Sequence, residues 1–166
     1  MIHHLSFAAE DPQRAAKAIA ELWGGEAFPF PPVAKGSWVA IAGDARGTTM
    51  EVYPAGCELH PVEGDADGEA RAAETPARFT ATHAAIATPL DAEAVHALAR
   101  RHGWISKYRK RGGIFGVIEV WVENAFLLEV LTPQMQREYT DFMSPDAWRA
   151  MLAKGGPPGR PAPAAA

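Results

Sequence analysis

Cysteine is almost absent from this sequence, and so are the segments that target or anchor a chain in a membrane. The single cysteine, Cys57, leaves no partner for an intramolecular disulfide, which favours a reducing compartment. Met1 leads directly into Ile2, His3 and His4, without the basic and apolar segments of a signal peptide, and no apolar run is long enough to cross a bilayer. These absences predict a cytoplasmic protein that has no membrane partner.

An excess of positive charge is also lacking. The 166 residues carry 16 Lys and Arg against 20 Asp and Glu, for a formal net charge of −4, so nucleic acid is not expected as a partner. The hydrophobic share of 48% is enough for a sizeable core. The length fits one compact domain or two small fused modules.

The sequence contains a repeated pattern that supports two small fused modules. A strand-like run around His4 leads to Asp11, and a similar run around His83 leads to Asp91. His4 is followed by Gly24 after 20 positions and by Glu51 after 47. His83 is followed by Gly103 after 20 positions and by Glu129 after 46. Such self-similarity predicts two copies of one structural unit.

The first unit is predicted to span 1–54. Alternation predicts a strand over 2–9, Asp11 and Pro12 are typical of a helix start, and Gly24 ends that helix. An edge strand with a loop follows over 26–33, then strands over 37–42 and 48–53 around a glycine-containing turn.

The second unit is predicted to span 79–133, after a linker over 55–78 that is rich in Gly, Pro, Ala and acidic residues. Its expected elements are a strand over 79–88, a helix over 92–102 and strands over 105–110, 114–122 and 126–131. A helical segment over 134–154, broken near Ser144 and Pro145, precedes a disordered tail over 155–166. The fold class is therefore α+β, with two tandem βαβββ modules and a helical extension.

Four motifs in this frame resemble the vicinal oxygen chelate superfamily, which includes glyoxalases, bleomycin-resistance proteins and extradiol dioxygenases. The motifs are His4–Asp11, Met50–Tyr53, Thr82–Ile86 and Leu128–Leu131, and the resemblance covers roughly 1–133. It implies that each module curls its sheet into half of a cup, within one chain or across two. It also implies a homodimer, as relatives often form.

The resemblance implies a metal site in the cup, made by His4, Glu51, His83 and Glu129. Alternation independently places each of these residues on one face of its strand. Two imidazoles and two carboxylates suit a divalent ion such as Zn, Ni, Fe or Mn, and leave coordination positions open for two substrate oxygens.

The set of two histidines and two glutamates is most similar to glyoxalase I, because extradiol dioxygenases and fosfomycin-resistance enzymes lack a carboxylate where Glu51 stands. By analogy, Glu129 is the first choice for the catalytic base and Glu51 the second. The arginine that helps glyoxalase I to hold glutathione is missing from Leu5–Ala9, which leaves the use of glutathione open. Arg109 in the basic run 107–111 could hold an anionic tail, and Tyr53 and Trp121 could line the pocket.

Three functions are left open by these residues. The leading hypothesis is a metal-dependent lyase or isomerase that moves a proton alpha to the carbonyl of a small-molecule substrate. One alternative is a non-catalytic protein that binds a small molecule in the same cup, and another is an extradiol-type dioxygenase. A simpler structural alternative for Glu51 and Glu129 is that both carboxylates face solvent on the open side of the sheet.

Overall fold

The computed structural model describes residues 2–30, 34–63, 68–75 and 77–155. The first βαβββ module contains β1 (His4–Ala9), α1 (Pro12–Trp23), β2 (Glu26–Pro29), β3 (Trp38–Ile41) and β4 (Thr49–Pro54). The second contains β7 (Ala84–Ala87), α2 (Ala92–His102), β8 (Ile105–Arg111), β9 (Phe115–Val122) and β10 (Phe126–Leu131). Between them lie β5 (Cys57–His60) and β6 (Glu69–Ala72), and α3 (Pro133–Phe142) and α4 (Pro145–Ala153) follow.

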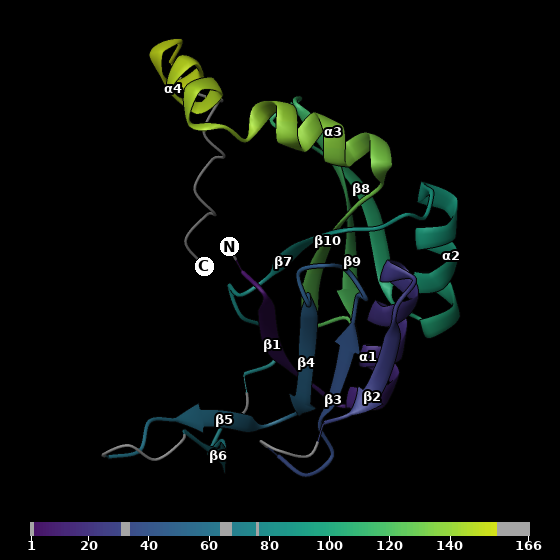
Figure 1. Cartoon of the computed structure of the whole chain (residues 1–166), viewed down its shortest axis with the longest axis vertical. Helices are drawn as coiled ribbons and strands as arrows, with labels where there is room; N and C mark the ends of the chain where they lie inside the picture. Colours follow the sequence, from purple (N-terminus) through teal and green to yellow (C-terminus); the bar gives the residue numbers. More distant parts are fainter. Residues whose placement is uncertain (1, 31–33, 64–67, 76, 156–166) are drawn as a thin grey trace, which may run out of the picture.

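Both modules build a four-stranded sheet with the same topology. The strand orders are β1-β4-β3-β2 and β7-β10-β9-β8. In each sheet the first strand pairs in parallel with the last, and the other pairs are antiparallel. The α+β class and the duplicated βαβββ modules predicted from the sequence are confirmed, and α1 and α2 lie beside each other along one side of the molecule (Figure 1).

The helix boundaries agree with the signals in the sequence. The carboxylates of Asp11 and Asp91 accept hydrogen bonds from backbone N–H groups in the first turns of α1 and α2, at 3.0 and 2.8 Å. Gly24 and Gly103 end the two helices with φ values of 69° and 70°, a conformation that glycine adopts without steric cost. The next residue, Gly25, is required for a different, steric reason, because a Cβ there would lie 2.0 Å from the carbonyl oxygen of Ile41.

The two modules share one hydrophobic core. Phe7 of β1 stacks on Phe126 of β10, with ring centroids 4.1 Å apart, and both belong to a single cluster of buried residues from both modules. The hydroxyl of Thr88 donates to the carbonyl of Leu22 at the end of α1. The carboxylate of Glu123, in the β9–β10 turn, accepts from the backbone N–H groups of Glu10 and Asp11 at 2.6 and 2.8 Å. The modules are therefore joined by polar contacts as well as by apolar burial.

The expected strand over 79–88 is wrong in its first half, because β7 begins only at Ala84. Its partner β10 pairs with it from Leu128, opposite Ala84, to Leu131. The pairing stops at Ala84 although β10 extends two residues further, to Phe126, and His83 therefore lies just outside the sheet.

The segment 55–78 contains the hairpin of β5 and β6, which the sequence analysis did not predict. The hairpin projects away from both sheets (Figure 1). Leu59 of the hairpin is exposed. The hairpin therefore lacks the alternation of buried apolar and exposed polar residues by which a strand is recognised in a sequence.

The C-terminal helices differ in how they are held. Met135 of α3 is buried, and Tyr139 and Phe142 of α3 pack against Phe115 of β9. Helix α4, which starts at Pro145 as predicted, has no buried residue. Residue 155 is described, and the rest of the predicted tail lies outside the described residues. In the part of the chain that the structure describes, no helix is both long and apolar enough to cross a membrane.

The contact between α1 and α2 predicts a pH dependence of stability. Nε of Arg14 donates to Nδ1 of His102 at 3.1 Å, and the imidazole stacks on Trp104 with centroids 4.6 Å apart. Burial, and then the positive charges of Arg14 and Arg101, lower the pKa of His102, although Glu21 acts in the opposite direction.

A histidine whose pKa is lower in the folded state makes folding less favourable once acid protonates the unfolded chain. We therefore expect the free energy of unfolding to fall as the pH drops below about 6.5, by at most about 1.4 kcal/mol per pH unit from this group. Urea titrations between pH 7.5 and 5 should show that the free energy of unfolding depends less on pH in His102→Gln, which keeps an acceptor for Arg14, than in the wild type. An equal pH dependence in both proteins would contradict the role given to His102.

Candidate functional site

The open face of the first sheet carries a small polar cluster around Glu51. Alternation along β4 places Thr49, Glu51 and Tyr53 on this face, while Met50 and Val52 are buried on the other. Oε2 of Glu51 accepts from Oγ of Ser6 at 3.1 Å and from the hydroxyl of Tyr53 at 2.5 Å. Ser6 lies directly opposite Glu51 in the parallel register of β1 and β4.

Tyr53 is the buried member of this cluster, with 5% of its surface exposed. Burial, and then the hydrogen bond that its hydroxyl gives to Glu51, raises the pKa of Tyr53 to about 12. Tyr53 is therefore a neutral donor at ordinary pH, and it fixes one oxygen of the half-buried Glu51 carboxylate. The other oxygen, Oε1, accepts none of the side-chain hydrogen bonds found among the described residues.

The open face of the second sheet carries an ion-pair cluster. Glu129 of β10 lies opposite Glu119 of β9, so two carboxylates meet in the middle of the sheet. Arg111, from the end of β8, donates to Oε1 of Glu129 through Nε at 2.9 Å and through Nη2, and its Nη2 also donates to Oε1 of Glu119 at 2.9 Å. Arg109 lies 3.6 Å from Glu119, a looser contact.

This cluster is more enclosed than an ordinary surface ion pair. The side chains of Glu119 and Glu129 are 13% and 14% exposed, and that of Arg111 is 33% exposed. The two carboxylates next to Arg111 raise its pKa, although burial acts in the opposite direction. Arg111 therefore remains charged and neutralises the repulsion between Glu119 and Glu129.

The two histidines predicted as metal ligands lie outside both clusters. His4 is exposed at the start of β1, and exposed His83 precedes β7 with Nδ1 3.0 Å from the carbonyl oxygen of Ala81. The residue opposite Glu129 in the sheet is Ala85 rather than His83. Across the described ranges, no group of three or more His, Cys, Asp and Glu side chains is arranged to hold a metal ion. The four predicted ligands His4, Glu51, His83 and Glu129 are thus not brought together within one chain.

The donors in this arrangement do not fit a divalent metal ion. Glu129 already has a cation bound, and an ion placed beside it would be repelled by the Arg111 guanidinium. Glu51 is held by two hydroxyl donors and has no second carboxylate or imidazole bonded to it in the described structure. A metal site from these residues would need Arg111 to move or a second chain to supply the missing ligands.

The residues predicted to contact substrate are divided between the modules. Trp121 on β9 and Arg109 on β8 share the open face with Glu119, as their strand alternation requires, and Trp121 is half-buried. Tyr53 belongs to the Glu51 cluster of the other sheet.

Sequence analysis missed Arg111, Glu119 and Ser6 as members of the two clusters. Glu119 could have been found, because it lies in the apolar run 115–122 and an unpaired charge there is costly. Arg111 could not be distinguished within the basic run 107–111 without knowing how β8 and β9 pair.

Comparison with known proteins gives similar structures but no similar sequence. The sequence matches no protein-family model and no curated protein. A possible glyoxalase from Bacillus cereus has 14% identity and a TM-score of 0.44, with 78% of this chain and 96% of that chain covered. A protein from the mobile metagenome of V. Pseudocholerae has 15% identity and a TM-score of 0.45, covering 78% and 92%.

The trypanothione-dependent glyoxalase I of Leishmania major has 16% identity and a TM-score of 0.49, with 93% of this chain and 97% of that chain covered. Glyoxalase-like proteins are thus among the similar solved structures. The fold assignment itself depends on the strand orders of the two sheets.

The Glu51 cluster predicts an unusual tyrosine titration. Spectrophotometric titration of the folded protein should show one tyrosine ionising near pH 12, because burial and Glu51 both oppose its anion. The variant Tyr53→Phe should lack this step, and Tyr108→Phe, which removes an exposed tyrosine, should keep it. An unchanged high-pH step in Tyr53→Phe would show that the shifted group is another residue.

The ion-pair cluster predicts a cost in stability when its cation is removed. Arg111→Met should lower the free energy of unfolding by about 1–2 kcal/mol, because it leaves Glu119 and Glu129 facing each other without a counter-charge. Arg109→Met, on the same strand and face, is the matched control and should cost less than half as much. Adding Glu129→Gln to Arg111→Met should recover part of the loss in urea unfolding, and a strictly additive double variant would contradict the coupling.

Proposed function

We propose that this chain is a non-catalytic small-molecule-binding protein with a glyoxalase-like fold, in which an arginine replaces a metal ion as the cation of the cup. The observation that supports this best is the position of Arg111 between Glu119 and Glu129. A guanidinium fixed by two carboxylates provides the positive charge that a bound ion would otherwise supply. It needs no cofactor, and it does not activate a substrate for proton transfer as a Lewis acid does.

The open face around this cluster has the mixed character of a ligand site. Trp121 and Leu127 are half-buried apolar side chains that share the open face of paired strands, and Arg109 and Lys107 add exposed positive charge along β8. Apolar area with a few placed polar groups is typical of sites that hold small organic molecules. The compartment that we propose for this binding protein is the cytoplasm.

A metal-dependent lyase or isomerase of the glyoxalase type is the second candidate. It is favoured by the orientation of Glu51 and Glu129, which both project on the open face of their sheet from equivalent last strands. In a homodimer, His4 and Glu51 of one chain could meet His83 and Glu129 of the other, with Glu129 or Glu51 as the base that moves the proton. The ion would be Zn, Ni, Fe or Mn, and an extradiol-type dioxygenase would use the iron.

Elemental analysis of the purified protein distinguishes the two candidates. The binding protein should contain far less than one transition metal per chain after exposure to Zn, Ni, Fe or Mn, and His83→Ala should not change that content. Arg111→Met should take up more metal than the wild type, because it frees two carboxylates.

The matched control is His60→Ala, which removes a histidine on β5 that lies outside both clusters. Near-stoichiometric metal that is lost in His83→Ala and Glu129→Gln, but kept in His60→Ala, would overturn the proposal in favour of the lyase or isomerase. Oxygen consumption with a catechol after iron loading would identify the dioxygenase instead.

A further inference from the structure

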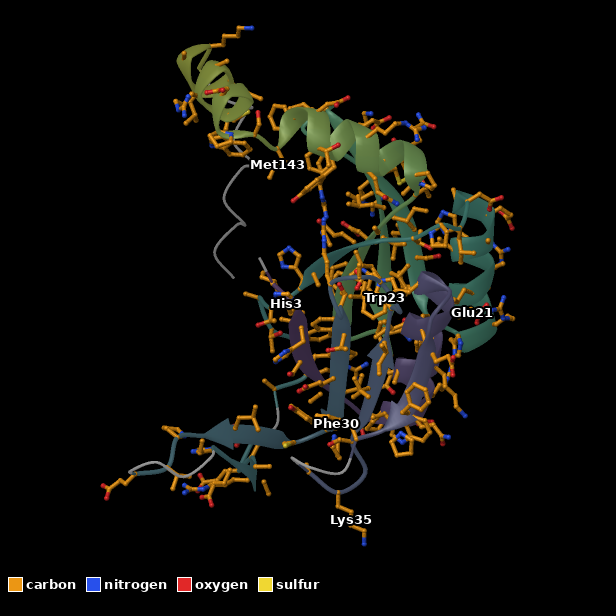
Figure 2. The ribbon with its side chains drawn as sticks, in the orientation of Figure 1. His3, Glu21, Trp23, Phe30, Lys35 and Met143 are labelled. Carbon is orange, nitrogen blue, oxygen red and sulfur yellow. The ribbon has the colours of Figure 1, made fainter. Side chains whose placement is uncertain are left out.

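An open surface cavity of about 540 Å³ lies where the two modules meet, and no residue of the two clusters described above lines it. The first module contributes Ile2, Trp23 and the β3–β4 turn, and the second contributes β7 with Pro89 and the start of α3. Trp23 is the last residue of α1 and lies near the module junction (Figure 2). A volume of this size at a boundary between modules is typical of a site for a small organic molecule.

The polar groups around this inter-module cavity are almost all occupied by partners within the protein. The Asp44 carboxylate accepts from the backbone N–H groups of Arg46 and Thr48 and from the Thr48 hydroxyl at 2.7 Å. The bonds from Thr48, and then the backbone bond and positive charge of Arg46, lower the pKa of Asp44, although burial acts in the opposite direction. The side-chain nitrogen of Gln136 donates to the carbonyls of Thr88 and Leu131, both at 2.9 Å.

Arg46 is the exception among these groups. Within the described residues, its guanidinium makes no ion pair and no side-chain hydrogen bond, yet it borders the cavity. Its backbone is nevertheless anchored, because its carbonyl oxygen lies 2.8 Å from Nδ1 of His3 and its N–H donates to Asp44. The turn therefore presents an arginine at the cavity from a fixed backbone position; its guanidinium is not hydrogen-bonded among the described residues, although its charge also acts on Asp44.

Several of the other lining residues are apolar. Trp23 is half-buried with its ring against the core, and Pro89, Pro133 and Ala87 border the same space. The N–H of Thr88 donates to Leu131 of β10, so strand alternation directs the N–H of Ala87 to the opposite edge of β7. That edge has no neighbouring strand in the described sheet, which leaves this N–H as a possible donor beside the apolar residues. A ligand with a flat apolar body and an acidic group would match both the walls and the charge.

We propose that this inter-module cavity binds a small organic anion, with its acidic group on Arg46 and its flat apolar part beside Trp23. The site borders the open face of the second sheet at Ala85, but none of the residues of the Glu51 and Arg111 clusters line it. It takes residues from both modules, and binding there stabilises the junction between them.

The test uses two probes that differ only in charge, 2-naphthoate and its neutral amide, 2-naphthamide. Calorimetric titration of the whole protein should give one site per chain, with naphthoate bound at least about tenfold more tightly than the amide, since the carboxylate gains a charge-assisted pair with arginine. Arg46→Gln should abolish this preference. Ala87→Phe, which fills the cavity from the exposed face of β7, should weaken both probes.

Arg71→Gln, on the projecting hairpin, is the matched control and should bind both probes like the wild type. Naphthoate should also change the tryptophan fluorescence, and Trp23→Phe should remove most of that change while preserving the fold. The absence of naphthoate binding, or binding that neither Arg46→Gln nor Ala87→Phe alters, would overturn this inference. Neither result would affect the metal analysis that tests the proposed function.

Discussion

The parallel pairing of the first and last strands is the constraint on which both candidate clusters depend. It places the last strand of each module inside the sheet, so Glu51 of β4 and Glu129 of β10 have neighbours on both sides. A carboxylate in that position needs donors from the adjacent strands. The first module supplies the Ser6 hydroxyl from β1, but the second has Ala85 at the equivalent place. Glu129 also faces Glu119 of β9, where the first module has Val39, and Arg111 from β8 pairs with both carboxylates. These differences give the two modules different chemistry.

The duplicated fold could be predicted because its signals are local. Asp11 and Asp91 begin the helices, and Gly24 and Gly103 end them at the same spacing of 20 positions from His4 and His83. The lack of a strand over 79–83 and the presence of the β5–β6 hairpin could not be predicted in the same way. The first depends on where the pairing of β7 with β10 begins, and the hairpin has exposed apolar residues such as Leu59 and so gives no hydrophobic period.

The candidate site was predicted in its orientation but not in its contacts. Alternation correctly placed Glu51 and Glu129 on the open faces, since the two-residue period of a strand decides this locally. Which side chains reach those carboxylates depends on register and on side-chain length. Arg111 reaches from the edge strand to both carboxylates, whereas Arg109 makes a looser contact with Glu119 at 3.6 Å and Lys110 pairs with Glu138 of α3.

The turn between β9 and β10 contains a strained residue that contacts the other module. Glu123 and Asn124 both have positive φ, at 53° and 56°, where glutamate is an unfavourable residue and glycine would be the relaxed choice. The carboxylate of Glu123 nevertheless binds the start of α1 in the other module. A glycine at position 123 would relax the turn but would remove the hydrogen bonds that join it to the first module. The strained glutamate therefore stabilises the contact between the two modules although it destabilises the turn itself.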